Sequence, residues 1–75
     1  MNEKFIRLLT VHDILTFQEC AECVQGEVTV TKGQFEVNGK SLLGLMSLEV
    51  SDGIKVRYPA RAIEFGEYLS LLEIK

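Results

Sequence analysis

Two short alternating runs near the middle of the chain set the strongest limit on its fold. Residues 27–31 (EVTVT) and residues 34–37 (QFEV) alternate apolar and polar side chains, as half-buried strands do. The dipeptide Lys32-Gly33 between them is typical of a tight turn, so the two runs predict a β-hairpin. A hairpin is antiparallel, and the predicted strands and helices follow one another too closely in the sequence for parallel crossovers. A doubly wound parallel sheet is therefore disfavoured.

The residues before the hairpin predict a strand followed by a helix. Residues 5–10 (FIRLLT) are apolar enough for a buried strand, although their period is ambiguous. A helix is expected from Val11 to Val24, because one helical face collects Ile14, Phe17, Ala21 and Val24. Thr10 or Asp13 would cap its start.

The residues after the hairpin predict a short helix, a strand and a terminal helix. Ser41 is expected to cap a helix that begins at Leu42, and residues 52–53 form a turn. Residues 54–58 alternate as a strand that Pro59 ends, and residues 60–74 are most simply a helix. The order βαββαβα predicts one α+β domain over residues 1–75, an open-faced sandwich with helices on one face of a four-stranded antiparallel sheet.

Composition narrows the classes of function. No apolar run approaches the roughly 20 residues that span a bilayer, and the N-terminus lacks the features of a secretory signal. The net charge of −3 argues against nucleic acid and anionic membranes as partners. We therefore expect a cytoplasmic protein whose two cysteines are reduced, Cys20 half-buried and Cys23 more exposed.

Residues 37–53, VNGKSLLGLMSLEVSDG, combine a turn, a Lys-Ser pair, a short apolar run and a second turn. This series resembles the second half of the histidine-containing phosphocarrier protein family, HPr, of the bacterial sugar phosphotransferase system. The family shares the βαββαβα order. The resemblance implies that Ser41 matches a serine phosphorylated by a dedicated kinase in many Gram-positive members. It also implies that Leu42, Leu43 and Met46 dock partner proteins, and we expect Leu42 and Met46 to be the exposed ones.

The family's phosphorylated histidine, which lies in a Gly-(Ile/Leu)-His-Ala-Arg-Pro-Ala segment, has no counterpart in this sequence. An ungapped alignment backward from Val28 places that histidine at Thr10, its arginine at His12 and its proline at Asp13. Threonine has no nitrogen to hold a phosphoryl group, and the bidentate arginine is missing. The resemblance thus implies a non-catalytic regulatory or protein-interaction module without a cofactor. Its partners would be a serine kinase, a transcription regulator or a transport-system component.

Two alternatives remain open at this point. In the first, His12 serves as the acceptor of a divergent phosphocarrier, although Asp13 beside it would repel an incoming phosphoryl group. In the second, Cys20 and Cys23 link an assembly through thiols or a shared metal. Because a tetrahedral zinc site would need two further ligands, the sequence predicts no metal site within one chain.

Overall fold

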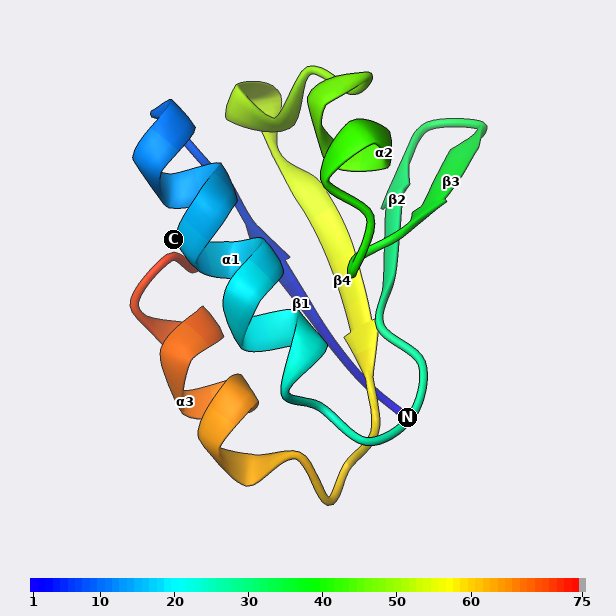
Figure 1. Cartoon of the computed structure of the whole chain (residues 1–75), viewed down its shortest axis with the longest axis vertical. Coiled ribbons are helices and arrows are strands. Elements are labelled where there is room, and N and C mark those ends of the chain that lie inside the picture. The colour runs from blue at the N-terminus through cyan, green and yellow to red at the C-terminus, as the bar shows by residue number, and fades with distance from the viewer. Residues whose placement is uncertain (75) are drawn as a thin grey trace.

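Four strands form one antiparallel sheet, and three helices cover one of its faces (Figure 1). The computed structural model describes residues 1–74. The sheet order is β1-β4-β2-β3, from strands β1 (Asn2–Ile6), β2 (Thr29–Lys32), β3 (Phe35–Asn38) and β4 (Ile54–Tyr58). The helices are α1 (Val11–Glu22), α2 (Leu42–Met46) and α3 (Ile63–Ser70), with a 3-10 turn, η1 (Val50–Asp52), before β4. The predicted α+β open-faced sandwich is confirmed.

Strand alternation and helical spacing build the core between the sheet and the helices. In β4, the buried residues Ile54, Val56 and Tyr58 face the helices, whereas Lys55 and Arg57 face the open side. The predicted face of α1 is confirmed, because Phe17, Ala21 and Val24 are buried and Ile14 packs against the core. The buried hydrophobic residues are Ile6, Leu8, Phe17, Ala21, Val24, Val28, Val30, Leu45, Val50, Ile54, Val56, Tyr58, Phe65 and Leu69.

The first strand lies earlier in the chain than the sequence predicts. It spans Asn2–Ile6 rather than residues 5–10, and it pairs along its whole length with β4. Beyond Ile6 the chain leaves the sheet, and the Leu8 N–H donates to the Val50 carbonyl at 3.1 Å. Leu8 is apolar because it enters the core beyond the strand, so its hydrophobicity misplaced the predicted element.

The hairpin is shifted by one residue and the last helix is shorter than predicted. Lys32 pairs with Phe35, so the turn consists of Gly33 and Gln34, with Gly33 at φ 59°. The expected helix over residues 60–74 is observed only as Ile63–Ser70. The chain after α3 returns to the sheet, where the Ile74 N–H donates to the Phe5 carbonyl at 3.0 Å. This contact gives β1 a neighbour at the edge of the sheet.

Gly39 marks a close approach that the fold requires. Its N–H donates to the Val28 carbonyl at 2.7 Å, and an added Cβ would lie 2.6 Å from Val28 Cγ1. We expect Gly39→Ala to lower the free energy of unfolding by about 1–3 kcal/mol, because Val28 is itself buried in the core. Urea unfolding measures this loss.

Gly33→Ala is the matched control for that substitution. A Cβ at Gly33 meets nothing within 4 Å, so only the backbone conformation opposes it, at a cost of about 1 kcal/mol. An equal or larger loss in Gly33→Ala would show that the contact with Val28 is not limiting.

Candidate functional site

A capping box closes the N-terminus of α1 at the position where the resemblance places the phosphorylated histidine. The Asp13 N–H donates to Thr10 Oγ1 at 3.1 Å. In return, Asp13 Oδ2 accepts from the N–H groups of Leu9 at 3.1 Å and Thr10 at 3.3 Å. Thr10 and Asp13, the two cap residues proposed from the sequence, therefore both act as caps. The side chain of each accepts from the backbone N–H of the other.

The same capping box changes what this helix terminus can bind. The first turn of a helix attracts anions through its free N–H groups and its dipole. Here the carboxylate of Asp13 already lies at this end and accepts two backbone N–H groups. An incoming phosphoryl group would meet a negative charge there. His12 is exposed in the same turn, directly before this carboxylate in the chain.

Ser41 is the N-cap of α2, as the sequence predicts. Its hydroxyl oxygen accepts from the Gly44 N–H at 3.1 Å, and the residue is half-buried. A phosphoryl group on this oxygen would add nearly two negative charges beside Leu42 and Leu43.

Two hydrogen bonds hold the start of α2 against α1. Gln18 Nε2 donates to the Lys40 carbonyl at 2.9 Å, and Lys40 Nζ donates to the Val24 carbonyl at 2.7 Å. The ammonium group thus satisfies a carbonyl just beyond the C-terminus of α1, where a positive charge is favoured. These contacts fix the position of Ser41 relative to α1.

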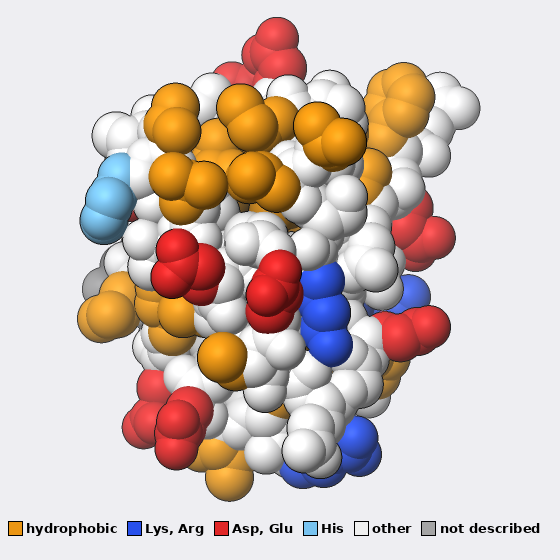
Figure 2. Space-filling view, in the orientation of Figure 1, with side chains coloured by type: hydrophobic (Ala, Val, Ile, Leu, Met, Phe, Trp, Pro, Cys, Tyr) orange, Lys and Arg blue, Asp and Glu red, His pale blue; other side chains and the backbone are white. Residues whose placement is uncertain are grey.

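Five exposed hydrophobic side chains gather where the start of α1 meets α2. Leu9, Val11 and Leu15 come from α1 and the residues before it, and Leu43 and Met46 come from α2; they are between 40% and 84% exposed. Figure 2 shows hydrophobic side chains gathered at the end of the molecule where Figure 1 places these elements. We call these five residues the α1/α2 patch. Exposed hydrophobic clusters of this kind mark interaction surfaces.

The structure corrects which of the predicted docking residues are exposed, and it exposes three more hydrophobic residues beside them. Leu43 rather than Leu42 is the exposed leucine at 84%, because Leu42 is half-buried, whereas Met46 is exposed as expected. Leu9, Val11 and Leu15 were not predicted. The spacing of Val11 and Leu15, four residues apart and off the core face of α1, was the signal in the sequence.

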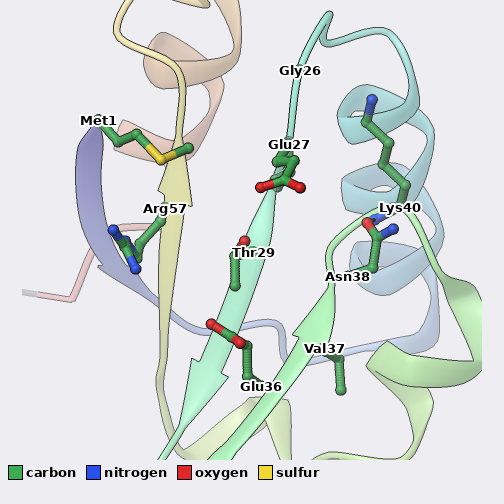
Figure 3. A pocket seen from close by; sticks show the side chains of 10 residues that line it. Met1, Gly26, Glu27, Thr29, Glu36, Val37, Asn38, Lys40 and Arg57 are labelled. Carbon is green, nitrogen blue, oxygen red and sulfur yellow. Dashed lines mark hydrogen bonds between the residues drawn. The ribbon is translucent and has the colours of Figure 1, made fainter.

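Apart from the α1/α2 patch, a depression lies along β2 and β3 (Figure 3). It has a volume of about 590 Å³, is shallow and open, and is lined by polar side chains that include Glu27, Thr29, Glu36 and Arg57. Lys40 also borders it, but Ser41, Leu43 and Met46 do not. This depression is therefore separate from the α1/α2 patch.

Cys20 and Cys23 are free thiols near the end of α1. Cys20 is half-buried and Cys23 is exposed, and both border an open groove beside α3. Burial raises the pKa of the Cys20 thiol, and the nearby Cys23 and Glu19 raise it further. Within residues 1–74, no group of three or more His, Cys, Asp or Glu side chains is placed to hold a metal ion.

We expect iodoacetamide to alkylate the exposed Cys23 faster than the half-buried Cys20 near pH 8. A thiol reacts as its thiolate, and the raised pKa of Cys20 lowers the thiolate fraction at any given pH. Mass spectrometry of Cys20→Ser and Cys23→Ser separates the two rates. Equal rates in the two variants would contradict the difference in burial.

The sheet order and the helices on one face define an HPr-like phosphocarrier fold. Residues 14–62 match the family model described as "PTS HPr component phosphorylation site". Since this match covers well over half of the sequence, the chain belongs to the HPr family of the phosphotransferase system. Among curated proteins there is no significant match.

Two of the similar solved structures match more than nine-tenths of the chain. HPr-C-His from Thermoanaerobacter tengcongensis is 26% identical, with a TM-score of 0.76 over 93% of this chain and 92% of that chain. The phosphocarrier protein HPr from Bacillus anthracis str. Ames is 22% identical, with a TM-score of 0.71 over 97% and 96% of the two chains. At 22% identity, the similarity to the Bacillus anthracis protein concerns the fold alone.

The extent of the family match bears on the predicted site residues. It includes Ser41 and α2, and it begins after Thr10 and His12. The placement of the family histidine at Thr10 therefore stays a prediction. None of the helices within the described part of the chain is long and apolar enough to cross a membrane.

Proposed function

We propose that this protein is a non-catalytic member of the HPr family that binds protein partners through the α1/α2 patch. The patch carries the proposal, because five large hydrophobic side chains stay exposed on two packed helices and the residues just before α1. Its partners are a serine kinase, a transcription regulator or a transport-system component of the bacterial cytoplasm. Phosphorylation of Ser41 regulates the binding.

The N-terminus of α1 supports a role other than phosphate transfer. We place the family histidine at Thr10, which has no nitrogen to hold a phosphoryl group and whose oxygen caps the helix by accepting from the Asp13 N–H. The Asp13 carboxylate occupies the place of an anion at this helix end. His12 is left as the acceptor of the alternative phosphocarrier mechanism, which this carboxylate opposes.

The position of Ser41 supports a regulatory role. Its oxygen caps α2 only as an acceptor, so a phosphate ester still has oxygens that accept from the Gly44 N–H. The modification leaves the helix start intact while it places a dianion beside Leu43. Charge rather than unfolding would then change the affinity of the patch.

Two phosphorylation reactions test this function by intact mass. We expect a gain of about 80 Da, one phosphoryl group, with ATP and the HPr serine kinase, and none with phosphoenolpyruvate and the first enzyme of the transport system. Ser41→Asn removes the hydroxyl but keeps a capping side chain, and it should abolish the gain. Ser47→Ala, an exposed serine at the other end of α2, is the control that should retain it.

The opposite pattern supports the alternative. A gain only with phosphoenolpyruvate, lost in His12→Ala, would make the protein a phosphocarrier that uses His12. A gain in neither reaction would remove Ser41 from the proposal and leave docking through the α1/α2 patch to be tested by binding.

A further inference from the structure

Acidic side chains border the α1/α2 patch at both ends. Glu19 and Glu22 follow Leu15 by four and seven residues on α1, so they continue the exposed stripe that carries Val11 and Leu15. Both are exposed, and the Glu22 carboxylate accepts only from the Gln18 amide among the described contacts. Figure 2 shows acidic side chains next to the hydrophobic cluster on this face.

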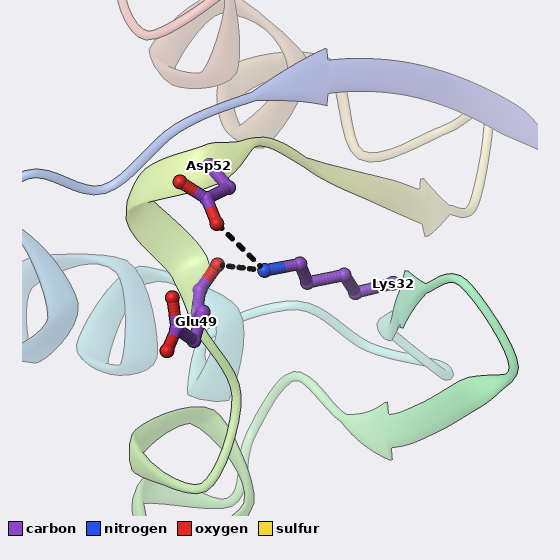
Figure 4. Close-up of polar contacts among 3 residues, drawn as sticks. All are labelled: Lys32, Glu49 and Asp52. Atoms are coloured by element: carbon purple, nitrogen blue, oxygen red, sulfur yellow. Dashed lines mark hydrogen bonds and ion pairs between the residues drawn. The ribbon is translucent and has the colours of Figure 1, made fainter.

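Beyond α2, a third acidic residue borders the patch. Glu49 is exposed and lies three residues after Met46, directly before η1. Figure 4 shows that its backbone carbonyl, not its carboxylate, accepts from Lys32 Nζ.

Most of the basic side chains around the patch already have partners. Lys32 Nζ donates to the Glu49 carbonyl at 2.8 Å and pairs with Asp52 at 3.3 Å (Figure 4). Lys40 is half-buried and its Nζ donates to the Val24 carbonyl. Lys55 and Arg57 face the open side of the sheet, where both lie within ion-pair distance of Glu3. Arg7, exposed two residues before Leu9, has no side-chain partner among the described contacts. The free charges at this end are therefore Arg7 and the carboxylates of Glu19, Glu22 and Glu49, with a net negative sign.

We infer that the partner of the α1/α2 patch presents apolar side chains surrounded by lysine and arginine. This inference rests on the proposed docking function and specifies its partner. Burial of the five apolar side chains supplies affinity. Glu19, Glu22 and Glu49 at the margin select and steer a surface of the opposite charge.

The same charges disfavour two other occupants. In a symmetric dimer formed through the patch, the acidic margins of both copies would face each other. An anionic lipid surface would likewise meet Glu19 and Glu22 as well as a net charge of −3. A different protein with a basic margin is the occupant that this surface fits.

Two synthetic helical peptides test the inference with the isotope-labelled protein. Both carry leucine at positions i, i+3, i+4 and i+7, and they differ in flanking residues, which are all lysine in one and all glutamate in the other. We expect the lysine peptide to shift the amide resonances of Val11, Leu15, Leu43 and Met46. It should bind at least about tenfold more tightly than the glutamate peptide at low ionic strength.

Paired variants locate the source of that preference. Glu19→Gln with Glu22→Gln should weaken the lysine peptide by roughly threefold to tenfold. The control pair, Glu64→Gln with Glu67→Gln, changes two exposed acidic residues of α3 and should have no such effect. Leu43→Ser should weaken both peptides, because it removes apolar area from the patch.

The outcomes separate this inference from the function on which it rests. If Leu43→Ser abolishes binding but both peptides bind equally, or the Glu19/Glu22 pair has no effect, the basic partner is overturned and docking stands. If Leu43→Ser changes nothing, docking through the patch is itself overturned. A dimer in sedimentation, or binding to phosphatidylglycerol vesicles, that Leu43→Ser abolishes would assign the patch to another occupant.

Discussion

Replacing Phe17 with alanine is expected to lower the free energy of unfolding by about 3–5 kcal/mol. Phe17 is fully buried in α1, and its ring centroid lies 5.7 Å from that of Phe65 in α3. It thus connects two helices above the sheet, and alanine would leave a cavity between them. The measured quantities are the urea midpoint and the melting temperature.

The size of the chain makes this loss severe. By the usual scaling, 75 residues give a total stability of about 4–11 kcal/mol, so the variant would lose a large share of it. Its melting temperature should fall by at least about 12 °C. Phe35→Ala is the matched control: Phe35 is 69% exposed at the hairpin, so we expect a loss below about 1 kcal/mol. Equal losses in the two variants would contradict the assigned core.

The elements that sequence reasoning located well are those with a strong period on one face. The helix α1 was predicted within two residues, because Phe17, Ala21 and Val24 repeat at helical spacing against a polar remainder. The strand β4 was predicted from the alternation of Ile54, Val56 and Tyr58. In both elements local propensity and burial agree, so the spacing of apolar residues is enough to locate the element in the sequence.

The misplaced elements depend on contacts between distant parts of the chain. The strand β1 begins at Asn2, whose place in the sheet follows from its pairing with Tyr58. The helix α3 stops at Ser70 because the following residues return to β1, where Ile74 donates to the Phe5 carbonyl. An apolar residue in a helix and one in an edge contact look alike in a sequence.

In the candidate site, too, features set by local sequence were predictable and features set by distant contacts were not. The cap at Ser41 was predictable from residue type and position. The exposure of Leu43 rather than Leu42 was not, because it depends on how α2 is turned over the sheet. That orientation is set in part by the contact between Gln18 and the Lys40 carbonyl, 22 residues apart in sequence.

Leu43→Ser is expected to weaken binding of the HPr serine kinase by about 10-fold to 100-fold. Leu43 is the most exposed residue of the α1/α2 patch, at 84%, and it follows the half-buried Leu42 by one position. A leucine that becomes fully buried on binding contributes about 1.5–3 kcal/mol, which gives this range. Titration calorimetry with the unphosphorylated protein measures the affinity.

Leu71→Ser provides a control of matched chemistry and exposure. Leu71 is 83% exposed directly after α3, outside the α1/α2 patch, so its loss should leave kinase affinity unchanged. Both substitutions remove an exposed leucine and should change the free energy of unfolding by less than about 0.5 kcal/mol. A fall in affinity for Leu43→Ser alone, at equal stability, assigns the effect to contact with the partner. Equal falls in both variants would mean that general surface hydrophobicity, rather than the α1/α2 patch, attracts the kinase.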